Sequence, residues 1–232
     1  MLVVLLLCAV VPTARAKCKI MGLTPSVLTP TRAAIAKDGG ILVGALDSDD
    51  GELVEGDAAR QDGWRIRVGS QATTPTIVLL APGLAIYKLP PDAKAGVLLD
   101  HKRTVVGEVT IAATPPAPLP APKIKKASYT ARTGRRPYAR LDIELDKVPA
   151  GAIAIVVTDA TGKARSWGQI EAGKTTVRGF DRERCQVLAN GTVESKPGDS
   201  IKVVFVDAGG RKSAPSSAAT VTGKAKPDPD DD

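Results

Sequence analysis

The sequence predicts an all-β fold made of two antiparallel β-sandwich domains that a proline-rich linker joins. Three observations predict this fold: short runs of β-branched and apolar residues, turn residues at short intervals between them, and one segment with five prolines in nine residues. Because 43% of the residues are apolar and only 3% are aromatic, the core must consist mainly of Val, Ile, Leu and Ala.

Residues 1–16 have the pattern of a secretory signal peptide. Leu2 to Val11 form an unbroken apolar run, and Ala14-Arg15-Ala16 fits the small-x-small cleavage pattern. The run is too short to span a membrane, which takes about 20 residues. We therefore predict cleavage before Lys17 and export to the periplasm, the cell surface or the extracellular space.

The proline-rich segment at residues 114–122 predicts the domain boundaries. Its composition favours an extended polyproline II linker that holds the domains apart. The predicted first domain, 17–113, carries 11 basic and 11 acidic side chains, whereas the predicted second domain, 123–223, carries 18 basic and 10 acidic ones. Residues 224–232 contain four carboxylates and two prolines, which predicts a disordered acidic tail.

Two segments alternate strictly between apolar and charged residues, which is typical of strands with one buried face. They are Trp64 to Val68 and Arg140 to Asp146. The other predicted strands are β-branched runs: 41–43, 76–80, 105–111, 153–158, 175–177 and 201–206.

The segment Pro197 to Ser213, with Ser216 to Val221 after it, resembles the last two strands of fibronectin type III or Ig-like modules. In those modules the penultimate strand ends in Asp-x-x-Gly-x-x-Ser, which here reads Asp207, Gly210 and Ser213. The first domain matches more loosely, through residues 105–111. The resemblance implies Ig-like or fibronectin type III-like sandwiches, which in extracellular bacterial proteins mostly space, bind or adhere.

A basic stretch at the start of the second domain predicts a polyanion-binding surface, because clustered cations attract anionic polymers. Its cations are Lys123, Lys125, Lys126, Arg132, Arg135, Arg136 and Arg140. The candidate partners are an anionic polysaccharide, a lipid phosphate or an envelope protein, and the export signal argues against nucleic acid. The alternative is a solvated strand and hairpin whose charges keep a sheet edge from pairing with another chain.

Two further clusters are candidate sites. Asp47, Asp49, Asp50 and Glu52 offer the oxygen ligands that calcium prefers, although they do not follow the EF-hand spacing and also fit a solvated loop. No other cofactor is predicted. Cys18 and Cys185 are the two thiols left after cleavage, and they either form a disulfide in an oxidising compartment or stay separate.

The composition argues against an enzyme. One histidine, His101, excludes zinc sites that need two, and three cysteines exclude a four-cysteine zinc site. The carboxylates of Asp142, Glu144 and Asp146 share a solvated strand face, where nothing raises the pKa of one of them to make a general acid. We therefore predict a non-enzymatic binding or spacer protein. The alternatives are a hydrolase with its site around residues 47–57 and His101, or an accessory structural subunit of an envelope assembly.

Overall fold

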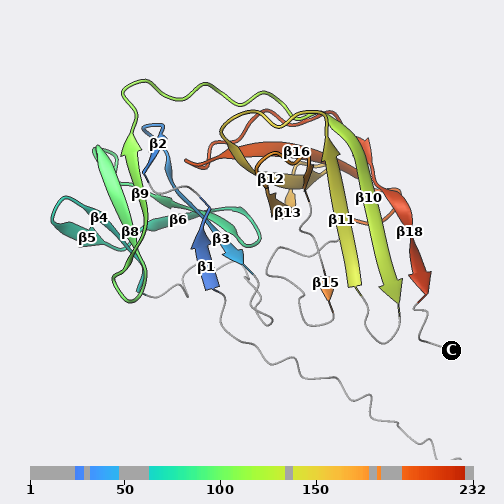
Figure 1. Ribbon diagram of the computed structural model, residues 1–232, viewed down its shortest axis with the longest axis horizontal. Coiled ribbons are helices and arrows are strands. Elements are labelled where there is room, and N and C mark those ends of the chain that lie inside the picture. Colours follow the sequence, from blue (N-terminus) through green and yellow to red (C-terminus); the bar gives the residue numbers. More distant parts are fainter. Residues whose placement is uncertain are drawn as a thin grey trace, which may run out of the picture.

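The computed structural model describes residues 24–28, 32–46, 63–133, 138–177, 182–183 and 195–227, and every regular element within these ranges is a β-strand. The all-β fold class is therefore confirmed. The strands form four sheets, two from residues 24–111 and two from residues 124–227, called the N-terminal and C-terminal halves below (Figure 1).

The N-terminal half contains the strands β1 to β9. They are β1 (Thr24–Val27), β2 (Ala33–Ile35), β3 (Gly40–Leu46), β4 (Arg65–Val68), β5 (Gln71–Thr73), β6 (Thr76–Ala81), β7 (Leu84–Lys88), β8 (Ala95–Leu99) and β9 (Val105–Ile111). Sheet I has the order β2-β9-β8-β4-β5, and sheet II has the order β1-β3-β7-β6.

The C-terminal half contains the strands β10 to β18. They are β10 (Ile124–Thr133), β11 (Tyr138–Leu145), β12 (Ala152–Asp159), β13 (Ala164–Gln169), β14 (Thr176–Val177), β15 (Arg182–Glu183), β16 (Ser200–Asp207), β17 (Ala219–Thr220) and β18 (Thr222–Pro227). Sheet III has the order β13-β12-β16-β17, and sheet IV has the order β14-β11-β10-β18, with β15 pairing to β11.

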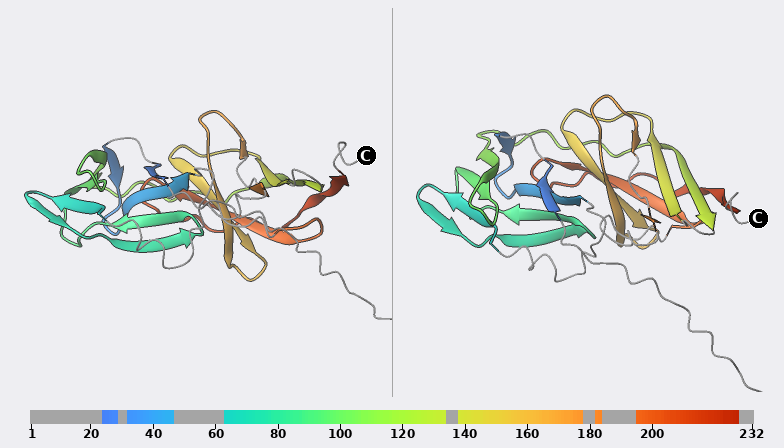
Figure 2. Two further views of the ribbon diagram at one scale, coloured as in Figure 1. Left: turned by 90° about the horizontal axis from the view of Figure 1, so that it is seen from below. Right: turned by 60° about the horizontal axis from the view of Figure 1, so that its bottom comes forward.

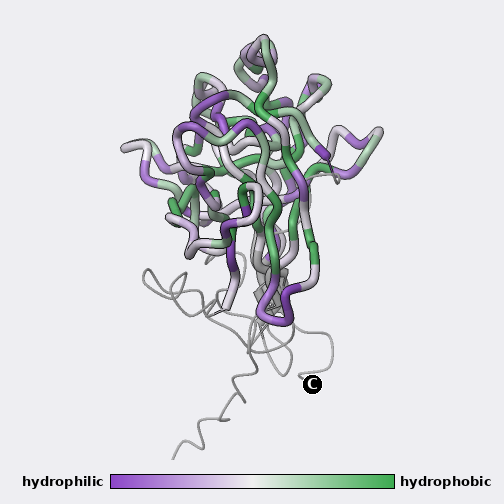
Figure 3. The backbone as a smooth tube through the Cα atoms, turned by 90° about the vertical axis from the view of Figure 1, so that its left-hand side faces the viewer, coloured by the Kyte–Doolittle hydropathy of each residue, from purple (hydrophilic) through white to green (hydrophobic). Residues whose placement is uncertain are grey.

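The four sheets are stacked as layers in the order I, II, III, IV. Three buried clusters fill the spaces between them: one between sheets I and II, one between II and III, and one between III and IV. The layers follow one another along the long axis of the molecule (Figures 1 and 2). Seen from the sheet I end, hydrophobic segments run through the interior and many peripheral turns are hydrophilic (Figure 3).

Successive residues of the two inner sheets point to different cores. In β12 of sheet III, Val156 packs toward sheet II and Ile155 toward sheet IV. In β7 of sheet II, Ile86 packs toward sheet III and Tyr87 toward sheet I. Because both faces of these strands are covered, apolar residues are needed at every position, which explains the continuous apolar runs in β7, β12 and β16.

The middle core joins the two halves through Trp167. This side chain is 2% exposed and packs in one cluster with Leu42 and Ile86 of sheet II. Gly44 makes room for it, since a Cβ at that position would lie 2.5 Å from the Trp167 ring. The proline-rich segment therefore does not hold the halves apart, as the sequence predicted, because their inner sheets bury apolar faces against each other.

The turn after β16 makes polar contacts with the linker and with sheet II. Arg211 donates from Nη1 to the carbonyl of Pro116 at 2.9 Å, and its Nε donates to the Asp207 carboxylate at 2.7 Å. Lys212 donates from Nζ to the Leu80 carbonyl at 3.3 Å, and burial lowers the pKa of Lys212. The Gly40 amide donates to the Gly209 carbonyl at 3.2 Å, so this one turn touches both the linker and the N-terminal half.

Three hairpin turns share one construction, in which an aspartate accepts hydrogen bonds from the backbone amides two and four residues later. The aspartates are Asp100, Asp159 and Asp207. The third residue after each has a positive φ, at Arg103, Gly162 and Gly210. The Asp-x-x-Gly pattern of the fibronectin-like resemblance is thus a hairpin cap that this chain uses more than once.

Most strands predicted from alternation and β-branched runs are confirmed. Leu141, Ile143 and Leu145 are fully buried, and Trp64 and Ile66 also point into a core. The prediction of a disordered tail at residues 224–232 differs from the structure, because β18 extends to Pro227 and pairs with β10, while residues 228–232 lie outside the described ranges. Parallel pairing with β10 satisfies backbone groups of this charged segment.

We expect Trp167→Ala to destabilise the N-terminal half as well as the C-terminal half. The free energy of unfolding should fall by about 3–5 kcal/mol because a large buried ring is replaced by a cavity. Fluorescence of Trp64, which lies in the core between sheets I and II, reports unfolding of the N-terminal half during denaturant titration.

Trp167→Phe is the matched control, since it also leaves Trp64 as the only tryptophan but keeps an aromatic ring in the middle core. It removes no described hydrogen bond, because the buried Nε1 of Trp167 has no partner among the described residues. If the denaturant midpoint followed by Trp64 fluorescence is the same in the two variants, the two halves unfold independently.

Candidate anion-binding site

The basic stretch predicted from the sequence runs along β10 and turns back into β11. Because β10 has ten residues, its ends lie about 30 Å apart. Lys123, Lys125 and Lys126 are at the linker end, and Arg132 is near the opposite end. Arg135 and Arg136 fall between the two strands, outside the described residues. The seven predicted cations therefore do not gather at one place.

Carboxylates of β11 and of Asp146, the residue that follows it, neutralise part of this stretch. Arg140 Nε lies 3.0 Å from Asp142 Oδ2, and Lys125 Nζ lies 3.4 Å from Asp146 Oδ1. Lys126 pairs in register with Glu144. The described part of this strand pair has mixed charge, and a site for an anion must be sought at one of its ends.

The linker end of sheet IV brings together lysines from three separate segments. The Asp146 amide donates to the Lys123 carbonyl at 2.9 Å, and the Leu145 amide donates to the Thr175 carbonyl at 2.9 Å. These two bonds place the start of β10, the end of β11 and the turn before β14 side by side. We call Lys123, Lys125, Lys147 and Lys174 the lysine cluster; all four are exposed.

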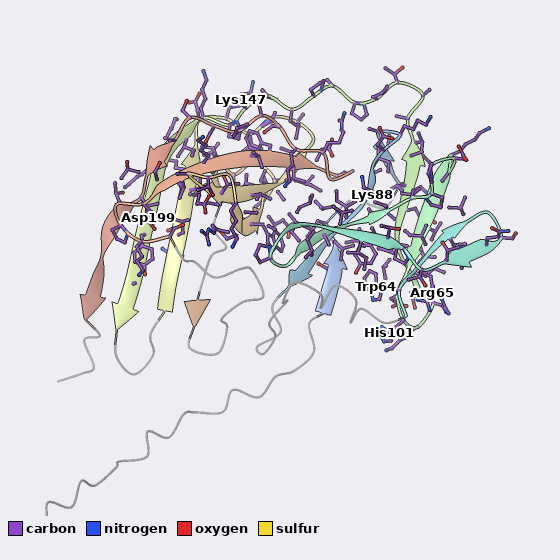
Figure 4. The ribbon with its side chains drawn as sticks, turned by 180° about the vertical axis from the view of Figure 1, so that it is seen from behind. Trp64, Arg65, Lys88, His101, Lys147 and Asp199 are labelled. Atoms are coloured by element: carbon purple, nitrogen blue, oxygen red, sulfur yellow. The ribbon has the colours of Figure 1, made fainter. Side chains whose placement is uncertain are left out.

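A cavity of about 350 Å³ opens beside two members of this cluster, Lys123 and Lys147. Asp146 also lines it, and its remaining lining is apolar: Pro120, Ala121, Pro149, Ala150 and Phe205. Phe205 is 1% exposed, so it forms part of the buried wall of the cavity. Lys147 lies beside the linker, far from His101 in the other half (Figure 4).

This arrangement suits a ligand that has both a negative charge and an apolar face. Lysine ammonium groups attract carboxylate, sulfate or phosphate as point charges, and salt screens such exposed charges. Proline rings and small side chains offer an apolar surface to a sugar ring. Asp146 is the one carboxylate among the described lining residues, and it opposes an anion there.

A second cavity, of about 320 Å³, lies at the opposite end of sheet III and is lined by Asp159, Arg165 and Asp199. Asp199 is labelled in Figure 4. Its charged groups already serve local turns: Asp159 and Arg165 the turn between β12 and β13, and Asp199 the turn before β16. Hydrogen bonds hold the pKa of Asp159 well below its usual range, chiefly the bond from the Thr161 hydroxyl and then the bond from Arg165. Asp199 accepts the Lys196 amide at 2.7 Å. We assign this cavity no ligand.

Several predicted site residues lie outside the described ranges: the calcium candidates Asp47, Asp49, Asp50 and Glu52, and the cysteines Cys18 and Cys185. Within the described residues, no group of three His, Cys, Asp or Glu side chains could hold a metal ion. None of the described segments forms a helix that could span a membrane.

His101 is exposed in the turn between β8 and β9. The neighbouring Asp100 uses its carboxylate to accept the amides of Lys102 and Thr104, both at 2.8 Å. Oxygen Oδ1 of this carboxylate therefore serves the turn.

Sequence reasoning missed Lys147 and Lys174. Neither belongs to a basic run. Lys147 joins the cluster because β11 ends beside the start of β10, and Lys174 joins it because the turn before β14 lies beside the end of β11. One sequence signal could have found Lys147. It directly follows the strand predicted at residues 140–146, and antiparallel pairing of that strand with the basic stretch would bring its end beside Lys123.

No family model matches this chain, and no curated protein is similar to it in sequence. Among solved structures, the chain is similar to the titin domains z1z2 in complex with telethonin, with 14% sequence identity and a TM-score of 0.22. This likeness covers 89% of the chain and 100% of the titin chain. The all-β fold class is shown by the sheets and cores described above.

We expect Asp146→Asn to tighten binding of a sulfated disaccharide about fivefold at low salt. The substitution removes a negative charge close to the expected ligand charge, and such a pair is worth about 1 kcal/mol in water. Calorimetric titration measures the change. Asp92→Asn, at an exposed aspartate of the N-terminal half, is the control and should change nothing; equal effects of both substitutions would argue against this site.

Proposed function

We propose that this chain is an exported, non-enzymatic binding or spacer protein of the cell envelope or extracellular space, whose basic C-terminal half binds an anionic partner. The lysine cluster carries this proposal, because two of its members from separate segments, Lys123 and Lys147, line a cavity whose walls are mostly apolar. Residues 123–223 carry 18 basic and 10 acidic side chains, so the longer-range field of this half also favours an anion.

The spacer role is supported by the stacked layers. Sheets that share buried faces resist bending relative to one another, because interiors are close-packed. We propose that each half is an Ig-like or fibronectin type III-like sandwich, with residues 114–122 as the linker between the two. In this proposal the chain presents the lysine cluster at a fixed distance from sheet I.

An anionic polysaccharide is the partner that this site fits best. A uronate or sulfated sugar combines the charge that the lysines attract with a ring that Pro120 and Pro149 can contact. Export through the predicted signal peptide would bring the protein to such polymers. In this proposal the mature chain begins at Lys17, which N-terminal sequencing of the exported protein tests.

We expect the double variant Lys123→Glu and Lys147→Glu to bind an immobilised sulfated glycan at least about tenfold more weakly than the natural chain. The two substitutions place like charges against the ligand, which weakens association. The natural chain should also elute earlier as salt rises, because its exposed ammonium groups are screened. Retention on the glycan column across a salt gradient measures both effects.

The matched control is Lys37→Glu with Lys94→Glu, which changes the net charge equally through exposed lysines of the N-terminal half. It should retain most of the affinity. If both double variants lose affinity to the same extent, net charge rather than the lysine cluster controls retention, and the proposed site is wrong. If retention of the natural chain on the glycan column does not change with salt concentration, the proposed function itself is wrong. If the natural chain binds phosphate-bearing vesicles as tightly as it binds the sulfated glycan, a lipid partner is favoured over a polysaccharide.

A further inference from the structure

Strand β6 forms an edge of sheet II. Among the described strands it pairs only with β7, in the antiparallel register that joins Val78 to Ile86. An edge strand presents a row of backbone amides and carbonyls that another strand can pair with. The edge lies on the rim of the N-terminal half (Figure 2).

The residues of this strand lack the charge and the proline with which proteins usually prevent such pairing. Its protection is confined to one end, where the register with β7 is irregular between Leu79 and Ala81 and Lys212 donates to the Leu80 carbonyl. No charged residue occurs from Gln71 to Tyr87, and the strand itself contains neither proline nor glycine. By contrast, the edge strand β5 is only three residues long, and the edge strand β18 contains Lys224 and Lys226. Short length and lysine are both means by which edges avoid aggregation.

Two apolar side chains are exposed beside this edge. Val78 is 39% exposed and Leu79 is 38% exposed, and they are two of the three large hydrophobic residues exposed within the described ranges. Because they are neighbours in a strand, they lie on opposite faces of sheet II. A strand added to this edge would therefore cover one apolar side chain on each face.

We propose that two copies of this chain form a dimer by antiparallel pairing of β6 with β6 of the second copy. A two-fold axis makes an antiparallel edge complementary to itself, so the interface closes with two copies. Charge also permits a second copy as the occupant: the residues of β6 are uncharged, the Lys212 ammonium contacts this strand only near its end at Leu80, and residues 17–113 carry 11 basic and 11 acidic side chains.

Such a dimer would carry two lysine clusters, one on each copy. Two linked sites bind a long polymer more tightly than one when both can engage it. The dimer proposal itself does not depend on the proposed polysaccharide partner, because it is argued from β6 alone.

Sedimentation velocity of the mature chain, residues 17–232, under reducing conditions tests the dimer. We expect the natural chain to sediment as a dimer and the double variant Val78→Lys and Leu79→Lys to sediment as a monomer, with its dissociation constant raised on the order of 100-fold by like charges across the interface. Val105→Lys is the matched control, because Val105 is 43% exposed on β9 of sheet I. It should stay dimeric.

Hydrogen exchange of the natural chain keeps the proposal testable if the lysine variant fails to fold. Exchange in residues 76–81 should slow as protein concentration rises, while exchange in β9 stays unchanged. A natural chain that is monomeric at its highest soluble concentration overturns the proposal. A dimer that survives both lysines at β6, or one that Val105→Lys dissociates equally, also overturns it.

Discussion

The arrangement of this protein depends on one buried contact, the packing of sheet II against sheet III. Without it, the apolar faces that carry Ile86 and Val156 would be exposed to water on both halves. Burying an aliphatic side chain of this size contributes about 1.5–3 kcal/mol, so this contact outweighs the few polar bonds around the linker. The stacking order of the four sheets and the position of the linker both follow from it.

The sequence contains the information for this contact, in a form that alternation alone does not reveal. Strands with one solvated face alternate, as Leu141, Ile143 and Leu145 do with their charged neighbours. Continuous apolar runs such as Ile153 to Val157 were recognised as strands, but a run of this kind is equally typical of any buried strand. Sheets cover both faces of β12. A local sequence pattern cannot predict this, because it does not specify which element packs on each face.

The candidate site was predictable only in part, for a similar reason. Sequence reasoning selected Lys123 and Lys125 because they lie in a basic run. It also selected Arg140, which is paired with Asp142 in the structure. Lys147 is isolated in the sequence and reaches the cluster through the hydrogen bonding of β10 with β11. Convergence of this kind is set by strand register, and register depends on long-range pairing rather than on composition.

The central claim is that the buried contact between sheets II and III, and not the linker, holds the two halves together. It is tested most directly by placing a specific protease site within residues 114–122, cutting the folded protein there and separating the products by size under native conditions. The account predicts that the two fragments stay together and elute as the uncut chain does. Fragments that separate into two folded halves would contradict it.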